Sequence, residues 1–146
     1  MRSEKGFTLI EMLAVMAIFA TLSGIAIINL KEFNNPAENG AAQLLGFLKQ
    51  ARARALSTTS AYFVMPTTNK HIITKYGLNC SDAAPVTDNS LKMTLPSSAT
   101  LGAIDWSICF TSRGLSDSNT TIVVSDPTNG SKTIEVLLGG GIRIQE

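Results

Sequence analysis

The side chains best suited to bind a metal or attack a substrate are Cys80, Cys109 and His71. The spacing of the two cysteines matches no common zinc motif, and one histidine cannot complete a four-ligand site. No nucleophile or acid stands beside His71, and no glycine-rich loop leads from a strand into a helix. We therefore expect no metal, no cofactor and no enzymatic activity, and we expect His71 to be structural or exposed.

The two cysteines have two interpretations that depend on the compartment. Outside the cytoplasm, Cys80 and Cys109 are expected to form a disulfide, which removes about 3–4 kcal/mol of unfolded-chain entropy. The alternative is a pair of buried free thiols. Asp82 and Asp88 lie in one polar stretch and could bind calcium, but two carboxylates alone make a weak ligand set.

Glu11 is the one charged residue in the apolar run from Phe7 to Ile28. About 22 helical residues at about 1.5 Å each span about 33 Å, which is enough to cross a bilayer core. An ordinary secretory signal would have a shorter apolar core, followed by a small-residue cleavage site. The sequence therefore predicts a transmembrane helix over residues 7–30. Arg2 and Lys5 precede the run, so the amino terminus is expected in the cytoplasm and the rest outside.

Gly6 and Phe7 lie at the junction of the short leader and the apolar run. The heptapeptide Lys5-Gly6-Phe7-Thr8-Leu9-Ile10-Glu11 resembles the processing signal of type IV prepilins and type II secretion pseudopilins. The resemblance implies a leader of residues 1–6, cleaved by a prepilin peptidase between Gly6 and Phe7, and N-methylation of Phe7. It also implies a single-pass precursor in the bacterial inner membrane, with a periplasmic or extracellular domain that joins other pilins in a filament.

Glu11 is the signature carboxylate of that resemblance. A carboxylate inside an apolar helix costs on the order of 2–3 kcal/mol, so such residues usually have a partner. Cleavage would create a cationic amine at Phe7, and Glu11 of one subunit could pair with that amine on its neighbour. The alternative is a glutamate that reaches toward the cytoplasmic interface.

A second helix is predicted within residues 31–59. Asn35 is a suitable N-cap, Pro36 suits the first helical position, and Glu38 follows three residues after the cap. We expect a bend near Pro36 that leads into an amphipathic helix. Its apolar stripe comprises Leu44, Leu48, Ala51 and Ala55, widened by Leu45, Phe47 and Leu56.

Lys49, Arg52 and Arg54 form a small basic cluster on this helix. One interpretation is a docking surface for acidic groups of a neighbouring subunit, and the other is a solvated helix face. Three positive charges are too few to indicate DNA binding, and the net charge of the chain is only +1.

Residues 60–146 have the period-two pattern of short strands separated by turn residues, which predicts antiparallel sheets packed on the helix. The fold class is therefore α+β. Residues 78–90 are expected to form a loop, and Gly139 to Gly141 a hairpin turn. The predicted strands cover residues 61–65, 71–76, 91–95, 106–111, 121–125, 133–137 and 142–144.

Three segments of the domain resemble the GspH/FimT-type minor pseudopilins: the helix at residues 44–55, the strand, glycine turn and strand at residues 108–124, and the final glycine-led strand at residues 141–144. The resemblance implies a pilin-like fold and a structural subunit at or near a filament tip. Some members bind DNA through two arginines around the final turn, whereas this chain has only Arg143 there. A DNA-binding minor pilin of natural competence is therefore the less favoured alternative. The sequence does not indicate which machine, secretion, pilus or competence, the subunit serves.

Overall fold

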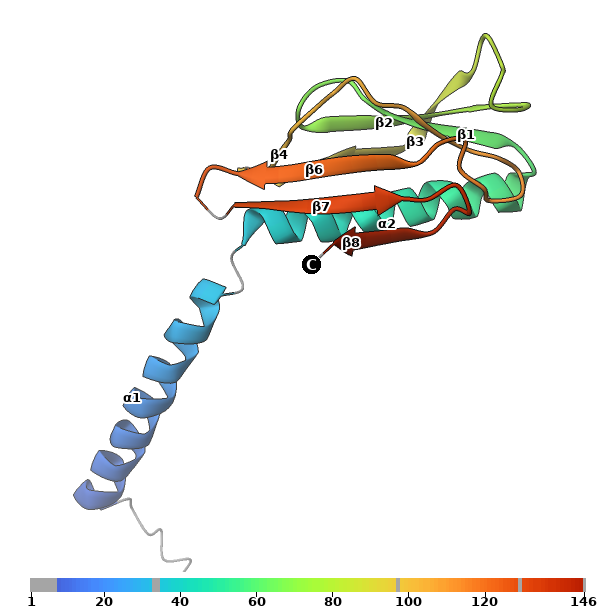
Figure 1. The fold of residues 1–146 in the computed structure, drawn as a ribbon. Coiled ribbons are helices and arrows are strands. Elements are labelled where there is room, and N and C mark those ends of the chain that lie inside the picture. The colour runs from blue at the N-terminus through green and yellow to red at the C-terminus, as the bar shows by residue number, and fades with distance from the viewer. Residues whose placement is uncertain (1–7, 33–34, 97, 129, 146) are drawn as a thin grey trace, which may run out of the picture. The chain divides into compact units, whose positions relative to one another are not determined.

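The computed structural model describes residues 8–32, 35–96, 98–128 and 130–145. The chain divides into two compact units, residues 1–34 and residues 35–146. The first unit contains helix α1 (Leu9–Glu32), and the second contains helix α2 (Pro36–Thr58) and eight strands among the described residues (Figure 1). The bend expected near Pro36 concerns residues 33 and 34, which lie outside the described residues.

Helix α1 is apolar on every side over the part whose side chains are described. Leu9 is 79% exposed, Ile10 74% and Leu22 59%, although these residues point in different directions around the helix. A helix that is apolar all round needs an apolar surrounding, whether lipid or other helices. In the described part of the chain, no helix combines the length and the apolar character needed to span a membrane.

Helix α2 begins as the sequence predicts. Asn35 has an extended backbone (φ −99°, ψ 97°), and its side-chain oxygen accepts a hydrogen bond from the backbone N–H of Glu38 at 3.3 Å. Pro36 occupies the first helical turn, where a missing N–H costs nothing. The helix ends at Thr59, whose left-handed φ of 54° lets its N–H bond to Ala55 O.

The predicted apolar stripe of α2 is confirmed. Leu44, Leu48, Ala51 and Ala55 are fully buried, and each leucine contributes about 1.5–3 kcal/mol by leaving water. The prediction was wrong for Leu56, which is 48% exposed. Leu56 lies beside the turn at Gly114, which covers only part of its side chain.

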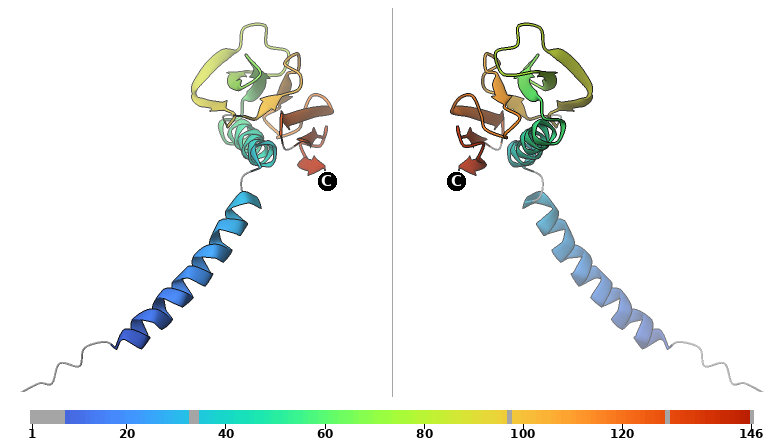
Figure 2. Two further views of the ribbon diagram at one scale, coloured as in Figure 1. Left: turned by 90° about the vertical axis from the view of Figure 1, so that its left-hand side faces the viewer. Right: turned by 90° about the vertical axis from the view of Figure 1, so that its right-hand side faces the viewer.

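The first sheet is antiparallel throughout and has the strand order β3-β2-β1-β5. Its strands are β1 (Ala61–Pro66), β2 (His71–Gly77), β3 (Val86–Thr94) and β5 (Ile108–Phe110). Figure 2 shows this sheet above α2 and the second sheet beside α2.

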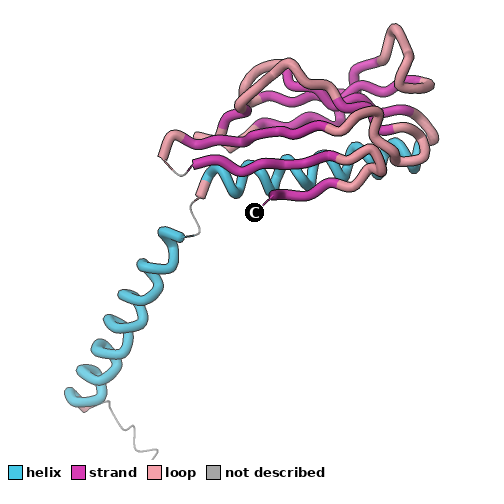
Figure 3. Tube along the Cα trace, in the orientation of Figure 1, coloured by secondary structure: helices cyan, strands magenta, loops and turns pink. Residues whose placement is uncertain are grey.

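The second sheet is also antiparallel and has the order β4-β6-β7-β8. Its strands are β4 (Thr100–Leu101), β6 (Thr120–Asp126), β7 (Gly130–Val136) and β8 (Ile142–Gln145). Helix α2 contacts strands of both sheets, as the tube in Figure 3 also shows. The core lies between α2 and the two sheets and includes Leu48, Val64, Phe110, Ile122 and Ile134.

Several strand boundaries differ from the sequence prediction. Strand β3 begins at Val86, within the expected loop of residues 78–90, because Thr87 and Asp88 pair with β2 across a bulge. The buried Thr74 hydroxyl, which donates to Leu91 O at 2.7 Å, fixes the pairing at that point. Strand β5 is shorter than predicted, β7 starts earlier, and the two-residue β4 was not predicted.

Candidate processing and assembly site

The predicted cleavage site, Gly6 and Phe7, lies outside the described residues. Cleavage between these residues and methylation of Phe7 therefore remain predictions from the sequence. The described part of the site begins at Thr8, directly after the predicted cut.

Thr8 and Glu11 cap the start of helix α1 reciprocally. The backbone N–H of Glu11 donates to Thr8 Oγ1 at 3.3 Å, and the backbone N–H of Thr8 donates to Glu11 Oε2 at 3.0 Å. The Thr8 hydroxyl also donates to Glu11 Oε2 at 3.0 Å. This is a capping box, in which two otherwise unpaired backbone donors are satisfied by two side chains.

The capping role of Thr8 was not predicted, although the signal was present. A threonine followed three residues later by a glutamate, just before an apolar run, is the sequence signature of a capping box. The hydrogen bonds that Glu11 accepts from the described residues all use Oε2. Its Oε1 therefore accepts none from that part of the chain and is available to a further donor.

The surroundings of Glu11 on its own helix are apolar and uncovered. Met12, Val15 and Ile18 lie in a shallow depression with Glu11, and they are between 49% and 58% exposed. A cluster of exposed apolar side chains of this size on one helix marks a surface that lipid or another protein covers. Glu11 thus lies at the N-terminal end of this apolar surface.

Arg54 of the predicted basic cluster is engaged within the domain. Its guanidinium bonds to Asp88 Oδ2 and to the Ser90 hydroxyl, each at 2.6 Å, and Tyr62 contributes a longer contact of 3.5 Å to Asp88. Hydrogen bonds from the Ser90 hydroxyl, followed by its backbone N–H and by Arg54, hold the pKa of Asp88 below its ordinary value. Arg54 therefore joins α2 to β3.

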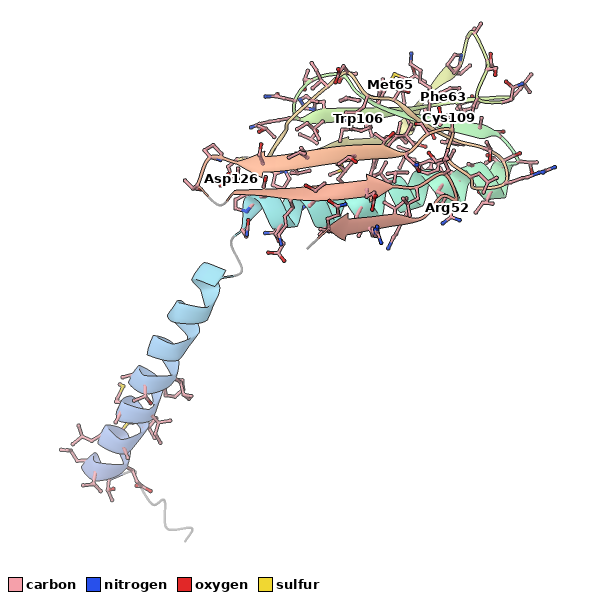
Figure 4. The ribbon with its side chains drawn as sticks, in the orientation of Figure 1. Arg52, Phe63, Met65, Trp106, Cys109 and Asp126 are labelled. Carbon is pink, nitrogen blue, oxygen red and sulfur yellow. A yellow bond between two sulfur atoms is a disulfide. The ribbon has the colours of Figure 1, made fainter. Side chains whose placement is uncertain are left out.

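Arg52 is also engaged, but with backbone. Its Nε donates to Gly114 O at 2.8 Å, and its guanidinium lies against Gly140 (Figure 4). Gly114 and Gly140 both have left-handed φ angles, of 74° and 75°, and a Cβ at Gly140 would collide with Gly114 O. Arg52 therefore ties α2 to two tightly packed glycine turns, and only Lys49 of the cluster stays exposed without an ion pair among the described residues.

Arg143 is paired across two strands of the second sheet. It stands directly opposite Glu135, and its guanidinium contacts Glu135 Oε2 at 2.6 and 2.7 Å. The charge on this face is therefore locally neutralised. Because DNA binding needs several free cations in a row, this arrangement adds nothing to the DNA alternative.

Cys80 and Cys109 form a disulfide, with Cα atoms 5.8 Å apart. Neither cysteine is free, so the alternative of two buried thiols is excluded. Cys109 lies in β5 and is 1% exposed, whereas Cys80 lies in the loop after β2. The bond therefore anchors that loop to the first sheet.

The remaining candidates for ligand binding are bonded to their neighbours. Asp82 accepts from the backbone N–H groups of Leu78 and Ala84, which lower the pKa of its carboxyl. His71 is exposed, and its Nδ1 lies 2.9 Å from the Thr94 hydroxyl. Asp82 and Asp88 have different partners, and the described residues contain no group of three or more possible metal ligands.

Comparison with known protein families gives a match at the amino terminus. Residues 1–27 match the family described as the prokaryotic N-terminal methylation motif. These residues include Gly6, Phe7 and Glu11, for which the sequence predicts roles in processing and assembly. A search among curated proteins found no match.

Solved structures match about three quarters of the chain. The type IV minor pilin FimU of Pseudomonas aeruginosa is 18% identical, with a TM-score of 0.57 over 75% of this chain and 88% of that one. The minor pseudopilin EpsH from the type II secretion system of Vibrio cholerae is 13% identical, with a TM-score of 0.58 over 76% and 97%. The chain has an N-terminal methylation motif followed by a pilin-like fold. The pilin-like α+β architecture expected from the sequence is therefore confirmed.

Proposed function

We propose that this chain is a minor pilin or pseudopilin, a structural subunit of a type IV pilus or a type II secretion pseudopilus. The observation that carries the proposal is the combination of an N-terminal methylation motif, an all-round apolar helix headed by Glu11, and a pilin-like domain. No catalytic chemistry is assigned to it.

The precursor is held in the inner membrane by its N-terminal helix. In this proposal the peptidase removes residues 1–6, and residues 7–30 remain on the mature protein. Arg2 and Lys5 favour a cytoplasmic amino terminus, which leaves the domain in the periplasm or outside the cell. The Cys80–Cys109 disulfide supports an exported domain, because disulfides persist in oxidising compartments.

Assembly transfers the apolar helix from lipid into a bundle of like helices. Covering the exposed side chains of α1 supplies much of the favourable packing. Glu11 of the entering subunit pairs with the terminal amine of a neighbouring pilin, which neutralises both charges and sets the stagger between the helices. The capping box leaves Glu11 Oε1 available for that contact.

The position at or near the filament tip is part of the same proposal and rests on the resemblance to minor pseudopilins. DNA capture is not proposed. Arg52, Arg54 and Arg143 are all engaged in contacts within the domain, and the net charge is +1. Lys49 alone does not make a phosphate-binding stripe.

The proposal is tested by blocking the cleavage in the native host. A Gly6→Leu variant places a side chain where the peptidase must approach the backbone closely. The matched control is Gly139→Ala, because a Cβ at Gly139 meets no atom within 4 Å. We expect the wild-type protein and G139A to be present in filaments sheared from cells. G6L should stay in the membrane with its leader uncleaved. Equal amounts of G6L and wild type in sheared filaments would overturn the proposal.

A further inference from the structure

The outer edge of β6 is only partly paired. Strand β4 covers β6 at Val124 and Ser125, and the last backbone bond on this side runs from Gly102 N–H to Val123 O at 2.9 Å. In an antiparallel sheet, alternate residues turn their N–H and C=O toward the same neighbouring strand. Thr121 therefore presents both groups to the same side as Val123, where none of the described strands pairs with it.

A groove lies beside this open stretch of edge. Its volume is about 320 Å³, and its lining consists of Gly102, Ala103, Trp106, Thr121, Ile122 and Val123. The indole of Trp106 forms part of the wall and is fixed there, because its Nε1 donates to Ala103 O at 3.1 Å (Figure 4). Val123 is 38% exposed, so the groove is accessible along β6.

The charges around the groove restrict what can occupy it. None of its lining residues is charged, so a charged side chain placed there would lose water without gaining an ion partner. Asp105 lies in the same segment as the Ala103 and Trp106 wall, is exposed, and makes no ion pair within the described residues. A matching segment therefore has an uncharged side chain for the groove and a basic residue near Asp105.

We propose that the edge of β6 at Thr121 receives an extended segment of a different, neighbouring filament subunit, whose strand continues the second sheet. The inference rests on the proposed function, because it requires a neighbour in a filament. Main-chain hydrogen bonds to Thr121 hold the incoming strand, and the Trp106 groove selects the side chain that it inserts. Exposed strand edges favour such pairing unless they are covered.

The edge is tested with a matched pair of substitutions in the full chain. Thr121→Pro removes the N–H that faces the open side, and the bonds between β6 and β7 remain because they use the alternate residues. Thr121→Val keeps the N–H and a β-branched side chain. A photo-crosslinking amino acid at Ala103, in the groove wall, reports contact with the partner in intact cells.

In the wild-type and T121V backgrounds, we expect crosslinks from Ala103 to an extended, centrally uncharged segment of another processed filament subunit, identified by peptide mass. In T121P the crosslink yield should fall about tenfold, since loss of a main-chain bond and the proline clash both oppose pairing. Thermal unfolding and the Cys80–Cys109 bond, checked in both variants, show that the domain stays folded.

Equal yields in T121P and T121V would overturn the inference, as would crosslinks to a second copy of this chain, to a helix, or to nothing. These outcomes are separate from a failure of the proposed function. If the chain is cleaved after Gly6 and found in filaments, but T121P and T121V behave alike, only the strand-pairing inference fails. If the chain is neither cleaved nor assembled, the proposed function itself is wrong.

Discussion

Glu11 accepts two hydrogen bonds from Thr8, one from its backbone N–H and one from its hydroxyl, both at 3.0 Å to Oε2. The same glutamate that the methylation motif contains therefore also occupies position N3 of a capping box. In the proposed assembly, the side chain of Glu11 combines two roles, helix capping and charge pairing between subunits. Substitutions can separate them.

Glu11→Gln should separate capping from charge. Glutamine retains a side-chain oxygen for the Thr8 backbone N–H, so the helix start is kept, but the negative charge is lost. We expect E11Q to reduce incorporation into filaments roughly tenfold, nearly as much as Glu11→Ala, since both lack the ion pair. The readout is the fraction of total subunit in sheared filaments.

The control is Glu38→Gln, which changes the first-turn glutamate of α2 in the same way. It should assemble like the wild type. Wild-type incorporation of E11Q together with failure of E11A would show that capping, and not charge, is the role of Glu11.

Arg52→Ala should destabilise the domain through its backbone contact. The substitution leaves Gly114 O without its donor and removes packing against Gly140, at a cost of about 1–3 kcal/mol. Lys49→Ala, on the same helix, should change the free energy of unfolding by no more than about 0.5 kcal/mol. Urea unfolding of the purified proteins in detergent measures both, and equal effects would contradict the structural role of Arg52.

Breaking the disulfide should weaken the domain by about 3–4 kcal/mol. The test uses a double variant. Cys80 is replaced by serine because it lies in a loop, and Cys109 is replaced by alanine because it is buried. We expect a lower unfolding temperature and faster proteolysis in the loop that contains Cys80. Addition of reductant should lower the wild-type temperature and leave the variant unchanged.

Acid should destabilise the contact between α2 and β3. The pKa of Asp88 is lowered in the folded protein, so the unfolded chain takes up its proton first as the pH falls. The stability from this carboxylate is complete above the ordinary aspartate pKa of about 3.9 and is lost below it. The difference in unfolding free energy between wild type and Asp88→Asn should therefore shrink between pH 6 and pH 3. Urea unfolding of both proteins at each pH measures this difference, and a difference that stays constant down to pH 3 would contradict the role of Asp88.

Local signals in the sequence predicted much of the fold. Asn35 and Pro36 start α2 where expected, because a cap depends on only a few adjacent residues. The start of strand β3 was misplaced because the first half of the strand is polar, whereas its second half lies where the sequence predicted a strand. It pairs only because β2 lies beside it and Arg54 holds Asp88 from the helix.

The candidate functional residues were predictable to different degrees in the two units. The run from Gly6 to Glu11 is a contiguous motif, so sequence order alone identified it. Arg52 contacts Gly114, which lies 62 residues further along the chain, and helix periodicity cannot indicate such a partner. Lys49, Arg52 and Arg54 therefore do not form the predicted docking cluster. Arg52 and Arg54 make contacts within the domain, and only Lys49 is exposed.

The most direct test of the account is the intact mass and the N-terminal residue of the protein from its own cells, prepared without reductant. We expect a chain that begins at N-methylated Phe7 and is lighter by two hydrogens because Cys80 and Cys109 are bonded. That result would establish processing at Gly6 and the disulfide together. An intact chain that begins at Met1 with two free thiols would contradict both the prepilin processing and the export on which the proposed function depends.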